Sequence, residues 1–159
     1  MPAIRVRFIA TEGFVGAAIR QITGSLFEHV ELGTSEGTWI GAHLKGGIQE
    51  RPAGYCKPFR EYVYDIPCTD DDLESLMAWA RSRIGTPYNL LDIIGLMFQA
   101  RSLRSPHRYI CSQFALEGLL HVFPAAKVLN VLPSWAYRVT PETLHLSPIF
   151  VGRLVKRVG

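Results

Sequence analysis

The sequence predicts an α+β fold in which an antiparallel β-sheet packs against a central helix that carries Cys111 near its start. Residues 4–66 hold short runs of alternating apolar and polar residues separated by glycine-containing turns, which is typical of successive strands. Residues 111–123 form an apolar stripe with helical spacing. With 159 residues, 48% of them apolar, and without a long linker, the chain is expected to form one domain spanning residues 1–159.

The N-terminal half is expected to contain most of the sheet. Its strands alternate in polarity and are broken by sharp turns at residues 34–37 and 45–47. A short helix interrupts them and ends at Gly24, a residue type common at helix C-termini. The expected strands are residues 4–10, 26–33, 38–43, 48–51 and 60–66, and the expected helix is 13–22.

A second helix is expected to start at Thr69 or Asp70 and to end at Gly85. The acidic run Asp70–Asp72 suits the positive end of a helix dipole, so we interpret it as helix-start chemistry and not as a metal site. Residues 90–100 are almost wholly apolar, but the run is shorter than the ~20 residues that span a membrane, and a buried helix is expected. Irregular chain and a last strand over 149–158 follow.

Composition narrows the function classes. The chain has 17 basic and 14 acidic residues, a net charge of +3 that is too small to indicate nucleic-acid binding. No leader pattern precedes the first expected strand, so a cytoplasmic protein without a transmembrane segment is expected. Three cysteines indicate reduced thiols, and Cys56 and Cys68 lack the spacing of a zinc site. No metal and no cofactor are therefore expected.

Cys111 is the first candidate for chemistry. It lies where a polar loop gives way to an apolar helix, so the free N–H groups and positive dipole of the helix start would favour a thiolate. A thiol there is expected to ionise more readily than a free cysteine, whose pKa is about 8.5. The alternative is a cysteine that only fills the core. A partner histidine would decide between the two.

His29 is the candidate partner. On the two-residue period of a strand, Val30 and Leu32 face the core, while His29 and Glu31 face a cleft or solvent. A thiol hydrolase needs a histidine that takes the proton of the cysteine, and a third polar group that orients the imidazole.

Four stretches together resemble a known family. They are the His-Val-Glu-Leu strand (29–32) with its following Gly-Gly-Ile turn, the Gly-Thr-Pro-Tyr-Asn stretch (85–89), the Tyr-Ile-Cys-Ser-Gln helix start (109–113) and Val-Thr-Pro-Glu-Thr-Leu (139–144). In this order, with the histidine strand first, they resemble the circularly permuted branch of the NlpC-like, papain-fold cysteine peptidases and amidases, of the phage, prophage or YiiX-like type.

The resemblance implies roles for individual residues. Cys111 would be the nucleophile and His29 its base. Tyr88 matches a tyrosine that lies beside the cysteine and helps polarise the substrate carbonyl; the alternative is an aromatic side chain that packs a turn. The backbone N–H of Cys111 could supply an oxyanion donor.

The third catalytic group is where the chain departs from the family pattern. The family places a polar residue on the strand after the hairpin, and the matching position here is Gly41. His43, two residues further along the same strand face, is the preferred replacement if the register shifts or bulges. Glu31 is the other candidate orienting residue.

The resemblance implies hydrolysis of an amide bond, often in peptidoglycan peptides, with a peptide-like or acyl substrate in a cleft and no nucleic acid. One alternative is a lipid acyltransferase or thioesterase similar to lecithin-retinol acyltransferase, although the Asn-Cys-Glu-His signature of that group is absent. Another is a non-catalytic phage-associated binding or structural protein, which Gly41 favours. Association with a virion would give a protein without a leader access to the wall. The oligomeric state is left open.

Overall fold

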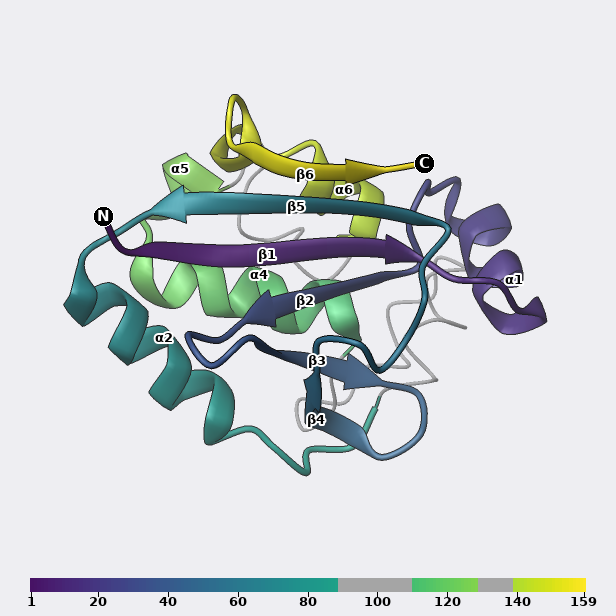
Figure 1. Ribbon diagram of the computed structural model, residues 1–159, viewed down its shortest axis with the longest axis horizontal. Coiled ribbons are helices and arrows are strands. Elements are labelled where there is room, and N and C mark those ends of the chain that lie inside the picture. Colours follow the sequence, from purple (N-terminus) through teal and green to yellow (C-terminus); the bar gives the residue numbers. More distant parts are fainter. Residues whose placement is uncertain (89–109, 129–138) are drawn as a thin grey trace.

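A computed structural model describes residues 1–88, 110–128 and 139–159 of the chain. It has a mixed α+β architecture built on a six-stranded antiparallel sheet in the order β4-β3-β2-β1-β5-β6 (Figure 1). The strands are β1 (Ala3–Ala10), β2 (His29–Gly33), β3 (Thr38–His43), β4 (Gly47–Pro52), β5 (Arg60–Pro67) and β6 (Leu154–Val158). The α+β class and the antiparallel sheet predicted from the alternation are therefore confirmed.

Strand β1 lies inside the sheet, paired with β2 on one side and β5 on the other. Its apolar residues Ile4, Val6 and Phe8 are fully buried, which is what the alternating pattern of a strand with one core face predicts. Arg7 points to the other face and lies directly opposite Glu31 of β2. This row of residues across β1 and β2 becomes part of the site described below.

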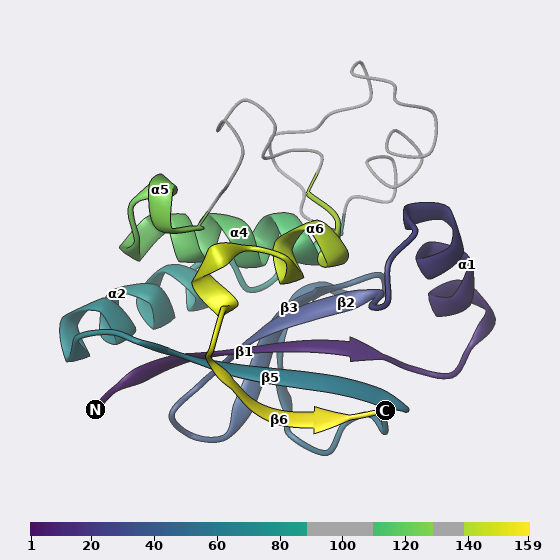
Figure 2. The same cartoon turned by 90° about the horizontal axis from the view of Figure 1, so that it is seen from above.

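Helices cover one face of the sheet (Figure 2). Among the described residues the longest helices are α2 (Asp70–Arg81) and α4 (Cys111–Val122), which pack against each other, and α4 also packs on β2 and β3. Gly118 lets α4 approach closely, because a Cβ atom there would lie 3.0 Å from Trp79 and 3.1 Å from Leu32. The shorter elements are α5 (Ala125–Val128), α6 (Pro141–His145) and the 3-10 helix η3 (Pro148–Phe150), while α1 (Phe14–Thr23) stands beside the end of the sheet.

The helix caps follow from local chemistry. Thr69 and Asp72 form a reciprocal capping box at the start of α2. Gly24 closes α1 in the left-handed conformation that glycine adopts without strain, with φ 62°. Thr140 caps α6, whose first residue is Pro141.

Several predicted boundaries were wrong. Helix α2 ends at Arg81, four residues before Gly85, and the intervening turns leave Ile84 exposed. Strand β2 begins at His29 and not at Leu26, because Ser25 forms a local turn through hydrogen bonds with Phe27. The predicted final strand over 149–158 starts only at Leu154, after η3. Helix α6 lies in chain that was expected to be irregular.

The apolar helix predicted over residues 90–100 lies outside the described residues. Among the residues that are described, no helix is long and apolar enough to cross a membrane.

Candidate functional site

Cys111 is the first residue of α4, and it is 4% exposed. The preceding residue, Ile110, is the extended N-cap of the helix. The thiol donates a hydrogen bond to the backbone oxygen of Glu28, with 3.5 Å between the two heavy atoms. Cys111 lines a narrow cavity together with Tyr88 and Glu28. The thiol therefore lies at a helix start and next to the residue that precedes His29.

His29 is the first residue of β2, and its side chain contacts both Cys111 and Glu31. Its Nε2 lies 3.2 Å from Oε1 of Glu31. Burial lowers the pKa of His29, but the hydrogen-bonding influence and the negative charges of Cys111 and Glu31 outweigh it and raise the pKa to about 10. The site therefore favours an imidazolium between a thiol and a carboxylate.

Glu31 is completely buried and is held on both of its oxygens. Arg7, itself 2% exposed, donates to Oε2 through Nε at 3.0 Å and through Nη2, while the hydroxyl of Tyr55 donates to Oε1 at 2.8 Å. Burial raises the pKa of Glu31, but the hydrogen bond and charge of His29, together with Arg7, outweigh burial and lower it to about 2. Glu31 is thus an ionised carboxylate with a fixed orientation.

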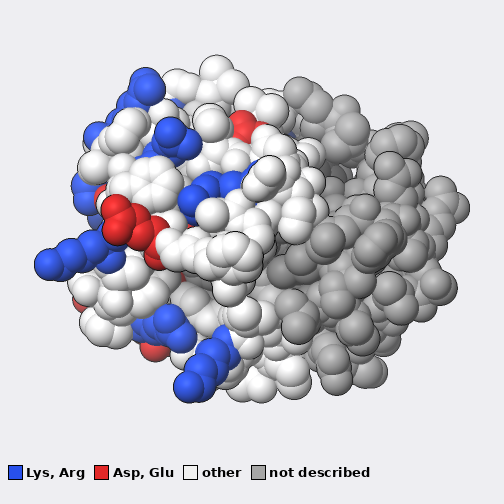
Figure 3. Space-filling view, turned by 90° about the vertical axis from the view of Figure 1, so that its right-hand side faces the viewer, with Lys and Arg blue, Asp and Glu red and all other residues white. Residues whose placement is uncertain are grey.

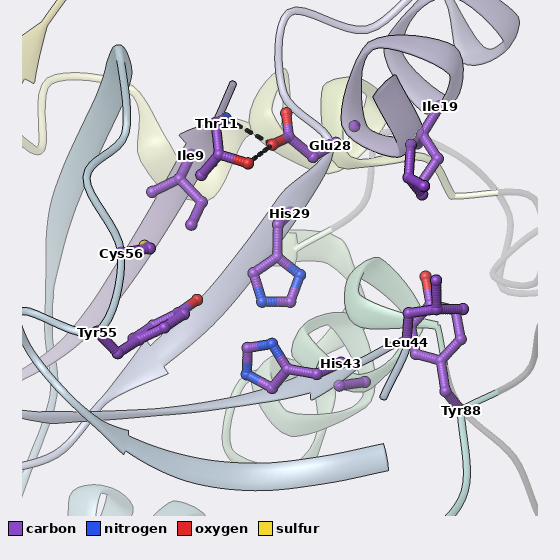
Figure 4. A pocket seen from close by; sticks show the side chains of 13 residues that line it. Ile9, Thr11, Ile19, Glu28, His29, His43, Leu44, Tyr55, Cys56 and Tyr88 are labelled. Carbon is purple, nitrogen blue, oxygen red and sulfur yellow. Dashed lines mark hydrogen bonds between the residues drawn. The ribbon is translucent and has the colours of Figure 1, made fainter. Parts of the chain in front are cut away.

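His43 lies beside His29 but does not form a hydrogen bond with it. The two ring centroids are 4.6 Å apart, and Figure 4 shows the rings facing each other across the pocket. Nε2 of His43 lies 3.4 Å from Oε1 of Glu31 and has no hydrogen-bond partner among the described residues. Burial, and next the charge of His29, lower the pKa of His43 to about 3. In this site His43 is therefore neutral, whereas His29 is charged.

Strand register brings these residues together. Strands β2 and β3 pair Leu32 with Ile40 and Gly33 with Trp39. Continuing this antiparallel register places His29 opposite His43 and Glu31 opposite Gly41. Opposite residues in an antiparallel pair point to the same face, so both histidines and Glu31 share one face of the sheet.

Gly41 leaves the space that the Glu31 side chain fills. A Cβ atom at Gly41 would lie 2.9 Å from Cγ of Glu31 and 3.2 Å from Nε2 of His29. A larger residue at this position would therefore displace the carboxylate. Of the two candidate orienting residues named from the sequence, Glu31 is the one within hydrogen-bond distance of His29, and His43 is not.

Tyr88 lies beside Cys111 in the same narrow cavity. Burial, and then the negative charge of Cys111, raise the pKa of Tyr88 well above its ordinary value of about 10. Its phenol therefore stays protonated and can act as a hydrogen-bond donor.

A larger cavity of about 260 Å³ opens next to the two histidines (Figure 4). Its wall includes three apolar side chains from α1 and β1: Ile9, Val15 and Ile19. Glu28 fixes α1 at this position, because it accepts hydrogen bonds from Thr11 and Arg20.

The outer face of α1 is also apolar, since Phe14 is 90% exposed and Val15 is 54% exposed. Figure 3, which views the molecule from the side that carries α1, shows charged side chains interspersed with surface that carries no charge. Val15 also lines the cavity, so it contributes exposed apolar surface at this place.

Sequence reasoning missed Arg7 and Tyr55. The position of Arg7 was an available signal, because it lies in the middle of a strand between residues expected to be buried. A buried arginine requires an acidic partner. Tyr55 lies in a turn after β4, and no pattern in the sequence connects it to Glu31.

Comparisons with known proteins give matches among solved structures. No protein-family model and no curated protein matches the chain. Among solved structures, the chain is similar to the crystal structure of the metalloprotein yiiX from Escherichia coli O157:H7, described as DUF1105, with a TM-score of 0.63. The match covers 99% of this chain and 96% of that chain at 14% sequence identity. At this identity the likeness shows a shared fold, in agreement with the YiiX-like resemblance seen in the motifs.

Proposed function

We propose that the protein is a thiol hydrolase of the permuted papain-like type, with Cys111 as nucleophile, His29 as base and Glu31 as the residue that orients His29. The observation that carries the proposal is the continuous chain of contacts from Glu31 through His29 to Cys111. It has the three roles that nucleophilic catalysis requires: a nucleophile, a base in contact with it, and a group that fixes the base.

The chemistry follows from these positions. In the reactive state His29 already holds the thiol proton as an imidazolium, and the sulfur of Cys111 attacks the carbonyl carbon of the substrate. The backbone N–H of Cys111 and the protonated Tyr88 phenol are the donors available to the carbonyl oxygen as it becomes negative. His29 then returns its proton to the leaving group, which departs and leaves an acyl group on the sulfur. A water molecule, deprotonated by His29, releases the acid and regenerates the thiol.

The acyl group of the substrate is expected to occupy the cavity beside His29. An amide bond, including that of a peptidoglycan stem peptide, is the first substrate class, because the motifs resemble amidases. The apolar wall formed by Ile9, Val15 and Ile19 favours a second class, esters or thioesters of fatty acids. Both classes use the same steps and differ only in the leaving group.

The test is the reactivity of Cys111 in a background in which Cys56 and Cys68 are replaced by serine. Iodoacetamide should alkylate Cys111 at pH 6 at least ~10-fold faster in the parent than in His29→Ala, because the histidine stabilises the reactive thiolate. His121→Ala is the matched control, since His121 lies near the other end of α4 and hydrogen-bonds to Ser75.

Substrate turnover is then tested by mass spectrometry of the protein after incubation with peptide amides, fatty acyl esters and acyl thioesters. An acyl adduct on Cys111 that is absent in Cys111→Ser is the expected result. Equal alkylation of Cys111 in the parent and in His29→Ala, together with no adduct from any substrate class, would rule the proposal out.

A further inference from the structure

We propose that His29, Glu31 and His43 form a binding site for a divalent transition-metal ion of the zinc type. We further propose that the bound metal and the thiol chemistry exclude each other, a regulatory consequence that rests on the proposed function. One potential ligand atom from each of the three side chains lies within 4.8 Å of the others. All three residues were candidates for the catalytic site, but a metal was not expected, because the histidines are 14 positions apart and lack the spacing of a zinc motif.

The distances suit a tetrahedral ion. Metal–ligand bonds of about 2.0–2.1 Å at the tetrahedral angle place neighbouring ligand atoms about 3.3 Å apart. Oxygen Oε1 of Glu31 lies 3.2 Å from Nε2 of His29 and 3.4 Å from Nε2 of His43. Two of the three ligand separations therefore already have the required length. For the third, the potential ligand atoms of the two rings lie within 4.8 Å of each other.

His43 supplies an independent indication of a ligand. The residue is 9% exposed, yet its Nε2 has no hydrogen-bond partner among the described residues and is directed toward Glu31. A buried polar atom without a partner destabilises the folded protein, and a metal ion would remove that cost by accepting the nitrogen lone pair.

Glu31 has one coordination position that a metal could take over from a hydrogen bond. Arg7 binds Oε2 and Tyr55 donates to Oε1, so the second lone pair of Oε1, which lies 3.2 Å from Nε2 of His29, is directed toward the histidines. A hydrogen bond to a ligating carboxylate of this kind fixes the orientation of the ligand. The fourth position of the metal would face the cavity that His29 and His43 line. Two imidazoles and one carboxylate are a ligand set that zinc accepts.

The exclusion follows from the chemistry of the imidazole ring. With Nε2 of His29 facing Glu31, Nδ1 is the nitrogen left for Cys111. A histidine that binds a metal through Nε2 carries its proton on Nδ1 and has no lone pair with which to take the thiol proton. Glu31 would be committed to the metal at the same time. The metal-bound protein would therefore lack its base.

Binding is tested with zinc alone by equilibrium dialysis and calorimetry, in a variant with all three cysteines replaced by serine so that no thiol contributes. One zinc ion per chain is expected in this background. Its affinity should fall at least ~10-fold in His43→Ala and in His43→Asn, which preserves much of the volume, and should not change in His121→Ala. Circular dichroism checks that each variant folds. No stoichiometric binding, or binding that His43 substitutions leave unchanged, would overturn the site.

Exclusion is tested separately, as the ratio of Cys111 alkylation rates with and without zinc in the Cys56→Ser/Cys68→Ser background. We expect zinc to slow alkylation by at least ~10-fold when His43 is present and to have little effect on the ratio in His43→Ala. Equal slowing in both variants would place the metal on Cys111 itself and overturn the exclusion. The metal-free rates test the thiol hydrolase, so a failure of either proposal is recognised independently of the other.

Discussion

Replacing Glu31 by glutamine should destabilise the protein by about 3–5 kcal/mol, because it removes one charge from a buried ion pair and leaves Arg7 without full compensation. Both residues of the pair are almost completely buried, so solvent screens them little. Glu61 contacts the same guanidinium at 3.3 Å and offsets part of the loss, which favours the lower end of the range. In a domain of this size, the corresponding fall in melting temperature is about 6–20 °C.

The matched control is Glu36→Gln. Glu36 also forms an ion pair with an arginine, Arg81, but the two side chains are 58% and 42% exposed, and exposed pairs contribute only about 0–1 kcal/mol. Urea unfolding at pH 7, with the same slope for all variants, measures both changes. A destabilisation of Glu31→Gln below about 1 kcal/mol, no larger than that of the control, would contradict the account of Glu31 as the charged centre of a buried network.

Three further predictions concern separate parts of the structure. Gly41→Ala should slow the alkylation of Cys111 and lower the free energy of unfolding by about 1–3 kcal/mol, because the added Cβ atom displaces Glu31. Gly54→Ala should change neither quantity, because its Cβ atom would meet nothing within 4 Å. Equal behaviour of the two variants would be evidence against steric crowding between position 41 and Glu31. Burial lowers the pKa of His145, so below pH ~6.5 the unfolded chain takes up a proton that the folded protein does not. The free energy of unfolding should therefore fall from pH 7 to pH 5 more steeply in the parent than in His145→Gln. Urea-unfolding measurements that give the same pH dependence for both proteins would contradict this. Thr69→Ala should lower the unfolding free energy by about 1 kcal/mol through loss of the capping box, and no change in the urea midpoint would show that this cap contributes nothing.

Much of the sheet could be predicted because one-sided burial leaves a period of two in the sequence. Val30 and Leu32 are fully buried on the core face, as expected. The start of α2 could be predicted because Thr69 and Asp72 act on the helix within three residues of sequence. Signals of this kind are local, and they therefore identify elements better than they identify contacts.

The contacts of the site depended on one residue of register. A turn limited to residues 34–37 would pair Gly33 with Thr38 and place His29 opposite Ala42, with His43 on the other face of the sheet. The structure instead pairs Gly33 with Trp39, which moves His43 to the face of His29. The choice between His43 and Glu31 as the orienting residue depended on this shift, and on Arg7 and Tyr55, which hold Glu31 from distant parts of the chain. No short-range pattern contains that information.

The close approach of Gly41 and Glu31 also constrains how such a site can change over generations. A lineage that carries its carboxylate on β3 cannot simply acquire a second one on β2, because the two side chains would compete for the same space. In this chain the glycine at position 41 is therefore coupled to the glutamate at position 31, and the two positions should be compared as a pair.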